Sequence, residues 1–134
     1  MFLSELSKEN QANYFKVAYA LVNADGKITE EEINTLNLYK SEVPDMKDIS
    51  EYKVHDVSEQ LKELALLDRK MKKKIYFEFI SLAYTDDEIS EEEKNIISDI
   101  ASIFEISDIE CKELNILAES MTKLLNKLGV LINE

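Results

Sequence analysis

The chain has 134 residues, a formal net charge of −12 and a composition that is 45% hydrophobic. This length suits one domain, and the hydrophobic content is too high for a disordered chain. Two glycines and one proline are too few for a sheet protein, whereas the abundant Leu, Glu, Lys and Ala favour helices. The composition predicts an all-α domain over residues 1–134, as a single compact bundle of about six to seven helices.

The acidic charge restricts the classes of partner. A surface of this charge repels nucleic-acid phosphate and anionic membrane surfaces, and it attracts cations and basic protein surfaces. We recognise neither a signal peptide nor an apolar run long enough to span a membrane. Cys111 is the only cysteine, so no internal disulfide can form. We therefore expect a cytoplasmic protein with a protein partner, no nucleic acid and no membrane span.

The first predicted helix runs from about residue 8 to 23, with Ser7 as its N-cap. Its second half is apolar almost all round, which is typical of a buried helix. The second helix begins after Thr29 and ends near Val43, because Pro44 disfavours helix at the residue before it. We expect its inner stripe to contain Ile33, Leu36 and Val43.

Residues 44–53 are polar and predict an irregular, flexible loop. A third helix is expected over about 56–67, with an inward face of Val57, Leu61, Leu64 and Ala65. The fourth, over about 70–84, resembles the first because its second half is again apolar nearly all round.

The fifth helix is expected after Ser90, with an inward face of Ile96, Ile97, Ile100 and Phe104. The sixth covers about 108–128, and Gly129 is expected to end it as a left-handed cap. An apolar stripe follows the sixth helix at spacings of three and four: Leu114, Leu117, Met121, Leu124 and Leu128. Such a stripe is more often core than a dimer contact, and a homodimer through this helix stays open.

One short phrase occurs twice in the chain. Residues 21–34 read LVNADGKITEEEIN and residues 82–95 read LAYTDDEISEEEKN, with seven of 14 positions identical at an offset of 61. Repetition at a fixed offset indicates a repeated structural unit. We expect two pseudo-symmetric helical repeats, about 8–43 and about 69–104, that pack around a pseudo-two-fold axis.

Every identical residue of the phrase can be given a structural role in a helix cap, a turn or the core. Thr29 with Glu32, and Ser90 with Glu93, have the spacing of capping boxes. Three glutamates in each first turn also face the positive end of the helix dipole. Asp25 and Asp86 are expected to hydrogen-bond forward to backbone N–H groups in their turns. This structural interpretation requires no ligand.

A divalent cation is the alternative interpretation of the same phrase. Calcium, magnesium and manganese prefer clustered oxygen ligands, and the candidate ligands are Asp25, Glu32, Asp86 and Glu93. An ordinary calcium-binding helix–loop–helix does not fit, because its first liganding position falls on Leu21 in one copy and Leu82 in the other. Any cation site would therefore be non-standard, and the two copies could share an ion only if both turns lay at the same end of the bundle.

The phrase also resembles the signature of a known family. A long apolar helix followed by A-D-G-K-I-T-x-x-E, here Ala24 to Glu32, resembles TerB-like domains. This all-helical family includes tellurite-resistance protein TerB and the N-terminal domain of some membrane-anchored DnaJ co-chaperones. The second copy departs from the pattern at Asp87 and Glu88. The resemblance implies a two-part helical bundle, an association with bacterial or phage stress response, and metal binding or protein scaffolding in place of catalysis.

A basic cluster stands at the start of the fourth helix, formed by Arg69, Lys70, Lys72, Lys73 and Lys74. Positive charge is unfavourable at that helix end. Pairing with neighbouring glutamates is the simpler explanation, and an anionic partner is the alternative.

Two functions follow from the sequence. The first is a non-enzymatic interaction module whose acidic surface, with Glu30, Glu31, Glu91 and Glu92 as candidate contacts, binds a protein partner. The second is a divalent-cation-binding module centred on the repeated turns. An enzyme is not expected, because His55 is the only histidine and no nucleophile–base set is recognised.

Overall fold

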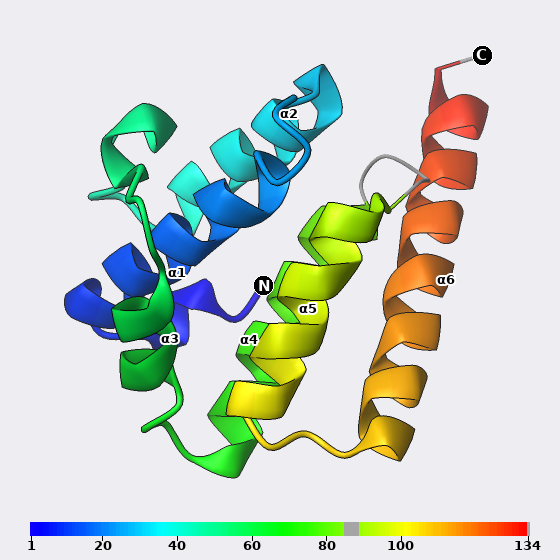
Figure 1. Cartoon of the computed structure of the whole chain (residues 1–134). Coiled ribbons are helices and arrows are strands. Elements are labelled where there is room, and N and C mark those ends of the chain that lie inside the picture. Colours follow the sequence, from blue (N-terminus) through cyan, green and yellow to red (C-terminus); the bar gives the residue numbers. More distant parts are fainter. Residues whose placement is uncertain (85–88, 134) are drawn as a thin grey trace.

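The computed structural model describes residues 1–84 and 89–133, except for the side chains of Lys40 and Ile49. Regular secondary structure in these residues is entirely helical, which confirms the predicted all-α class. Short 3-10 helices cover Leu3–Glu5, Tyr39–Ser41 and Ile49–Tyr52. The α-helices are arranged as in Figure 1: α1 (Lys8–Val22), α2 (Glu30–Leu38), α3 (Ser58–Leu64), α4 (Arg69–Ala83), α5 (Glu91–Ile103) and α6 (Asp108–Ile132).

The two helices with the most buried residues, α1 and α4, pack against each other at the centre of one hydrophobic core. The rings of Tyr14 and Phe79 stack there with centroids 4.5 Å apart, and Phe15 meets Tyr14 edge-on. α3 and the 3-10 helix Ile49–Tyr52 cover α1, whereas α5 and α6 pack on α4. The nearly all-round apolar character of both central helices follows from this central position.

Polar caps fix where the helices begin. The hydroxyls of Ser7, Thr29, Ser90 and Ser107 each accept the backbone N–H three residues ahead. An N-cap of this kind is worth about 1 kcal/mol. The predicted starts of the first, second, fifth and sixth helices are therefore confirmed.

The end and the orientation of α2 differ from expectation. The α-helix stops at Leu38 and tightens into the 3-10 turn Tyr39–Ser41, where the Ser41 hydroxyl donates to the Leu38 carbonyl. Ile33 is exposed, so its assignment to the inner stripe was wrong. The buried positions of this segment are Glu32, Leu36, Tyr39 and Val43. Leu36 and Val43 are buried as predicted, and Glu32, whose side chain caps the helix, takes the inward place that was assigned to Ile33.

The segment 44–53 is not only a polar loop. It contains the 3-10 helix Ile49–Tyr52, and the buried Tyr52 ring packs beside Phe15 with centroids 5.3 Å apart. The Tyr52 hydroxyl accepts the Lys47 backbone N–H at 3.0 Å. α3 is shorter than predicted, yet Leu61 and Leu64 are buried on its inner face as expected.

α6 is longer and more exposed than predicted. Gly129 lies inside the helix, which continues to Ile132, so the expected left-handed cap is wrong. The apolar stripe is also not core beyond Leu114: Leu117, Leu124 and Leu128 are each more than half exposed. The reason is that α4 is the principal neighbour of α6, and α6 continues past it along the edge of the molecule (Figure 1).

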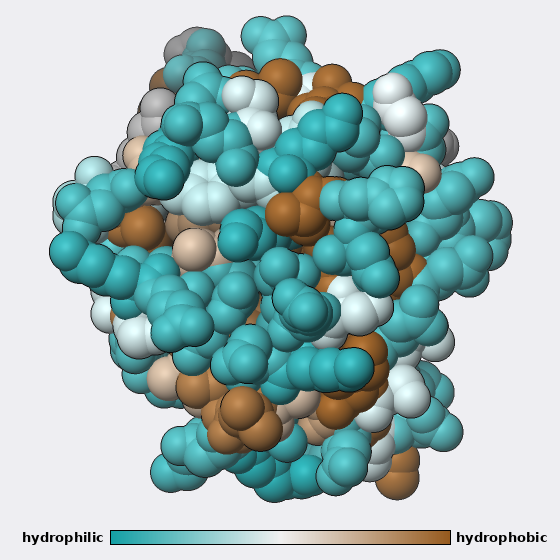
Figure 2. Space-filling view, turned by 60° about the vertical axis from the view of Figure 1, so that its left-hand side comes forward, coloured by the Kyte–Doolittle hydropathy of each residue, from teal (hydrophilic) through white to brown (hydrophobic). Residues whose placement is uncertain are grey.

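The molecular face in Figure 2 is mainly hydrophilic, with apolar atoms in separate patches. Within the described part of the chain, no helix is long and apolar enough to cross a membrane. Three of the five residues of the basic cluster at the start of α4 form the ion pairs that the simpler interpretation predicts: Arg69 and Lys73 both contact Glu110, and Lys74 contacts Glu5.

Candidate functional site

The first acidic turn connects α1 to α2. Asp25 accepts the backbone N–H of Lys27 through Oδ1 at 2.9 Å, as predicted for a turn carboxylate. Gly26 has a positive φ of 80° in this turn, which glycine adopts without steric cost. The turn is therefore closed by its own residues.

Glu32 is almost entirely buried, with 3% of its surface exposed. Its Oε1 accepts both the backbone N–H and the hydroxyl of Thr29 at 3.1 Å, while the Thr29 hydroxyl accepts the Glu32 N–H. This reciprocal pair is the predicted capping box. One of the three glutamates in the first turn of α2 thus has a structural role.

The second copy repeats this arrangement at the start of α5. Glu93 is 6% exposed, and its Oε1 accepts the backbone N–H and the hydroxyl of Ser90. The Ser90 hydroxyl accepts the Glu93 N–H at 3.1 Å, which completes the second predicted capping box. Asp86, the remaining candidate metal ligand, lies outside the described residues.

The candidate metal ligands Asp25, Glu32 and Glu93 all accept backbone N–H groups within their own turns. In the ranges 1–84 and 89–133, no three Asp, Glu, His or Cys side chains lie close enough together to hold a metal ion. The cation hypothesis stays a prediction, and it depends on residues that include Asp86.

The four candidate partner contacts are exposed. Glu30 and Glu31 project from the first turn of α2, and Glu91 and Glu92 project from the first turn of α5. Glu91 also forms a weak ion pair with Lys94 at 3.4 Å. The starts of α2 and α5 both lie toward the upper end of the molecule in Figure 1. Each copy of the phrase therefore divides its glutamates into one buried cap and two exposed charges.

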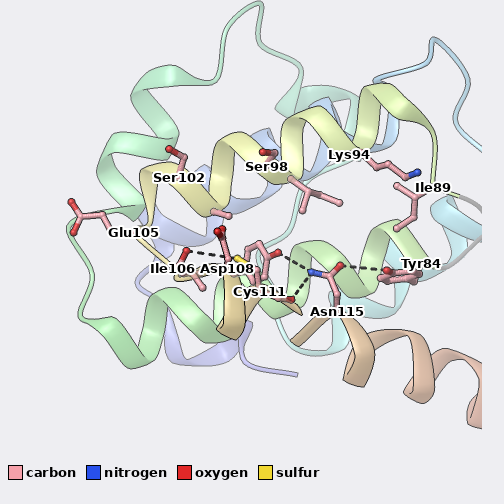
Figure 3. Close-up of a pocket in the computed structure, with 13 residues that line it drawn as sticks. Tyr84, Ile89, Lys94, Ser98, Ser102, Glu105, Ile106, Asp108, Cys111 and Asn115 are labelled. Atoms are coloured by element: carbon pink, nitrogen blue, oxygen red, sulfur yellow. Dashed lines mark hydrogen bonds between the residues drawn. The ribbon is translucent and has the colours of Figure 1, made fainter. Parts of the chain in front are cut away.

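A pocket of about 610 Å³ lies between α4, α5 and α6, and the second copy of the phrase contributes Tyr84, Ile89 and Lys94 to its lining (Figure 3). Its walls combine apolar side chains with hydroxyl, amide, thiol and charged groups. The lining includes Tyr76, Tyr84, Ile97, Ser98, Ser102, Asp108, Cys111 and Asn115.

The Asn115 side chain organises one wall of this pocket. Its Nδ2 donates to the Tyr76 hydroxyl at 3.0 Å and to the Cys111 carbonyl at 2.7 Å. The Tyr84 hydroxyl donates to its Oδ1 at 3.4 Å. The oxygen and the nitrogen of the Asn115 amide are therefore both held by hydrogen bonds. Their partners lie on α4, directly after α4, and on α6 (Figure 3).

The phenols of this wall stay protonated at neutral pH. Burial, followed by the nearby Cys111 thiol, raises the pKa of Tyr76. Burial also raises the pKa of Tyr84. The wall can offer hydroxyl and amide hydrogen bonds to a ligand.

No pattern in the sequence predicted this pocket. Tyr76 and Asn115 are 39 residues apart, and only the packing of α6 on α4 brings them together. Cys111 is partly buried and packs against the core.

No family model, curated protein or solved structure matches this chain. The resemblance to TerB-like domains therefore stays a prediction from the residues of the repeated phrase.

Proposed function

We propose that this protein is a non-enzymatic interaction module whose acidic helix ends bind a basic segment of a protein partner. The observation that carries the proposal is the division of glutamates in both copies of the phrase. Glu32 and Glu93 are buried and form the capping boxes, whereas the two glutamates before each of them are exposed. The capping box uses one glutamate per copy, and the other two, which the helix dipole also favours, stay accessible to a partner.

The placement of the exposed charges supports a docking role. The helix dipole stabilises carboxylates at a helix N-terminus, so the exposed glutamates do not destabilise the free protein. The net charge of −12 adds a long-range field that attracts basic partners. A basic segment reaching the upper end of the bundle in Figure 1 would meet charge from two helices.

We further propose that the two acidic ends belong to related halves of the bundle. Each copy of the phrase follows a 15-residue buried helix, α1 or α4, and each opens an amphipathic helix with a capping box. Two equivalent ends would let a partner with two basic groups bind more tightly than one end allows. The stress-response setting is suggested by the TerB-like resemblance alone.

The test neutralises the exposed glutamates and leaves the caps intact. The variant carries Glu30→Gln, Glu31→Gln, Glu91→Gln and Glu92→Gln, and the probe is a fluorescently labelled peptide of alternating Lys and Ala residues. Exposed ion pairs are worth about 0.2–1 kcal/mol each, so we expect about tenfold weaker binding in fluorescence anisotropy. Circular dichroism should show unchanged helicity.

A matched control separates the site from the net charge. It carries Glu9→Gln, Glu51→Gln, Glu59→Gln and Glu63→Gln, four exposed glutamates elsewhere on the molecule. The proposal requires that this control binds the peptide more tightly than the site variant. Equal weakening of both variants would show that only net charge attracts the peptide and would contradict the proposed site.

A further inference from the structure

The C-terminal part of α6 carries large apolar side chains that the rest of the fold does not cover. Six of them are between 51% and 70% exposed: Leu124, Leu125, Leu128, Val130, Leu131 and Ile132. Scattered apolar residues are normal on a surface, but a continuous group on one element marks an interaction site.

These side chains continue a regular pattern. Leu114, Leu117, Met121, Leu124, Leu128 and Leu131 follow one another at alternating spacings of three and four residues. This is the a/d spacing by which two helices pack along a common seam. The seam begins on the part of α6 that packs against the core at Leu114 and ends on the exposed part at Leu131.

A groove accompanies the covered end of the seam. It has a volume of about 370 Å³ and lies between the N-terminal segment, α4 and α6. Its exposed lining is apolar, and the lysines contribute their aliphatic stems. The lining residues are Met1, Phe2, Lys73, Lys74, Phe77, Leu114, Leu117 and Met121. The first half of the seam, Leu114 to Met121, therefore lies beside the groove, which we call the recess. The second half, Leu124 to Leu131, is exposed, and we call it the ridge.

We propose that the occupant of this surface is the α6 helix of a second copy, packed antiparallel. The exposed end of each α6 would then lie in the groove of the other molecule. In this register Leu131 faces the partner's Leu114, Leu128 faces the partner's Leu117 and Leu124 faces the partner's Met121. Every layer of the seam is apolar, and the contact is closed because each molecule contributes the same ridge and the same recess.

The amount of apolar surface is sufficient for a dimer. Burying one large aliphatic side chain removes on the order of 100 Å² from water. Seven seam and flanking residues contribute: Leu117, Met121, Leu124, Leu125, Leu128, Leu131 and Ile132. With the groove, they approach the roughly 800 Å² that each partner supplies to a standard interface.

The antiparallel orientation follows from where recess and ridge lie. A parallel pair would set ridge against ridge, leave both grooves empty and bring two bodies of charge −12 side by side. The antiparallel pair fills both grooves and separates the two bodies along the helix axis. Because the contact is apolar and the bodies repel each other, added salt should tighten the dimer. The acidic docking of a basic peptide should weaken with salt, so the two proposals fail independently.

The first test is sedimentation equilibrium of the purified chain. We expect a species of twice the monomer mass and a dissociation constant that falls as salt is raised. The variant Leu124→Glu with Leu128→Glu should weaken the dimer by about 100-fold or more, because the seam would bury unpaired charges. Both positions are exposed in the single chain, so helicity should be retained.

A control variant changes the same helix by the same charge. Ile109→Glu with Ile116→Glu alters two exposed apolar residues outside the seam and should leave the dimer intact. A monomeric wild-type chain at high concentration, a trimer, or a dimer that survives the seam substitutions would each overturn the proposal.

Disulfide trapping tests the orientation. In a Cys111→Ser background, Leu117→Cys and Leu128→Cys are made as separate single-cysteine proteins. An antiparallel seam predicts efficient cross-linking only when the two proteins are mixed and oxidised, since position 128 faces position 117 of the partner. Cross-linking of either protein with itself in preference to the mixture would show a parallel pair and would overturn the register.

Discussion

α4 and α6 are both rich in apolar residues, yet they differ in what covers them. α4 buries Ile75, Phe79, Ile80 and Leu82 completely in the core. α6 buries Ala118 and leaves most of its larger apolar side chains exposed. The comparison shows that an apolar stripe on a helix predicts a packing partner. It does not predict whether that partner lies in the same molecule or in another one.

The largest expected difference is in stability. Leu82→Ala in α4 removes a completely buried side chain and should lower the free energy of unfolding by about 2–5 kcal/mol. Leu124→Ala in α6 makes the same chemical change at a 65% exposed position and should stay within about 0.5 kcal/mol of wild type. Urea denaturation of dilute protein measures both. Similar losses for the two variants would mean that α6 is covered within a single chain.

A smaller effect concerns how the first half of α6 is attached to α4. Glu110 on α6 contacts Lys73 and Arg69 on α4 and accepts the hydroxyl of Ser107. Lys73, then Ser107 and Arg69, lower the pKa of Glu110 from 4.5 to about 2. Because the folded pKa is lowered, this stabilising contribution is fully present above about pH 4.5 and is lost as the pH falls towards 2.

Glu110→Gln tests this attachment. The difference in stability between wild type and variant should be largest above pH 4.5 and should shrink on acidification, as measured by thermal melts from pH 7 to pH 2. Glu113→Gln, an exposed neighbour on the same helix, is the control and should show no comparable pH-dependent difference. A constant difference for Glu110→Gln across this range would show that the ion pairs do not stabilise the fold.

The sequence predicted helix starts better than helix ends. Ser7, Thr29, Ser90 and Ser107 are local signals, because a hydroxyl and the N–H that it accepts lie three residues apart. The end of α6 depended on Gly129, and a glycine stops a helix only where the chain takes the left-handed conformation.

In the candidate site, too, the sequence predicted the local contacts and not the contacts between distant residues. Both capping boxes were recognised from spacing alone, and the exposure of Glu30 and Glu31 follows once Glu32 turns inward. The position of Ile33 was missed because the apolar side chain was expected to face inward, whereas the capping Glu32 takes that place. The network around Asn115 was not predictable, because its partners on α4 are distant in the chain.

Hydrogen exchange at low and high protein concentration tests most directly whether a second copy covers α6. The account predicts that amides of α4 are protected at both concentrations, since their cover is internal. Amides of residues 124–132 should exchange quickly in dilute protein and slow markedly in concentrated protein, with the slowing abolished by the Leu124→Glu and Leu128→Glu pair. Exchange of residues 124–132 that is independent of concentration would contradict the account.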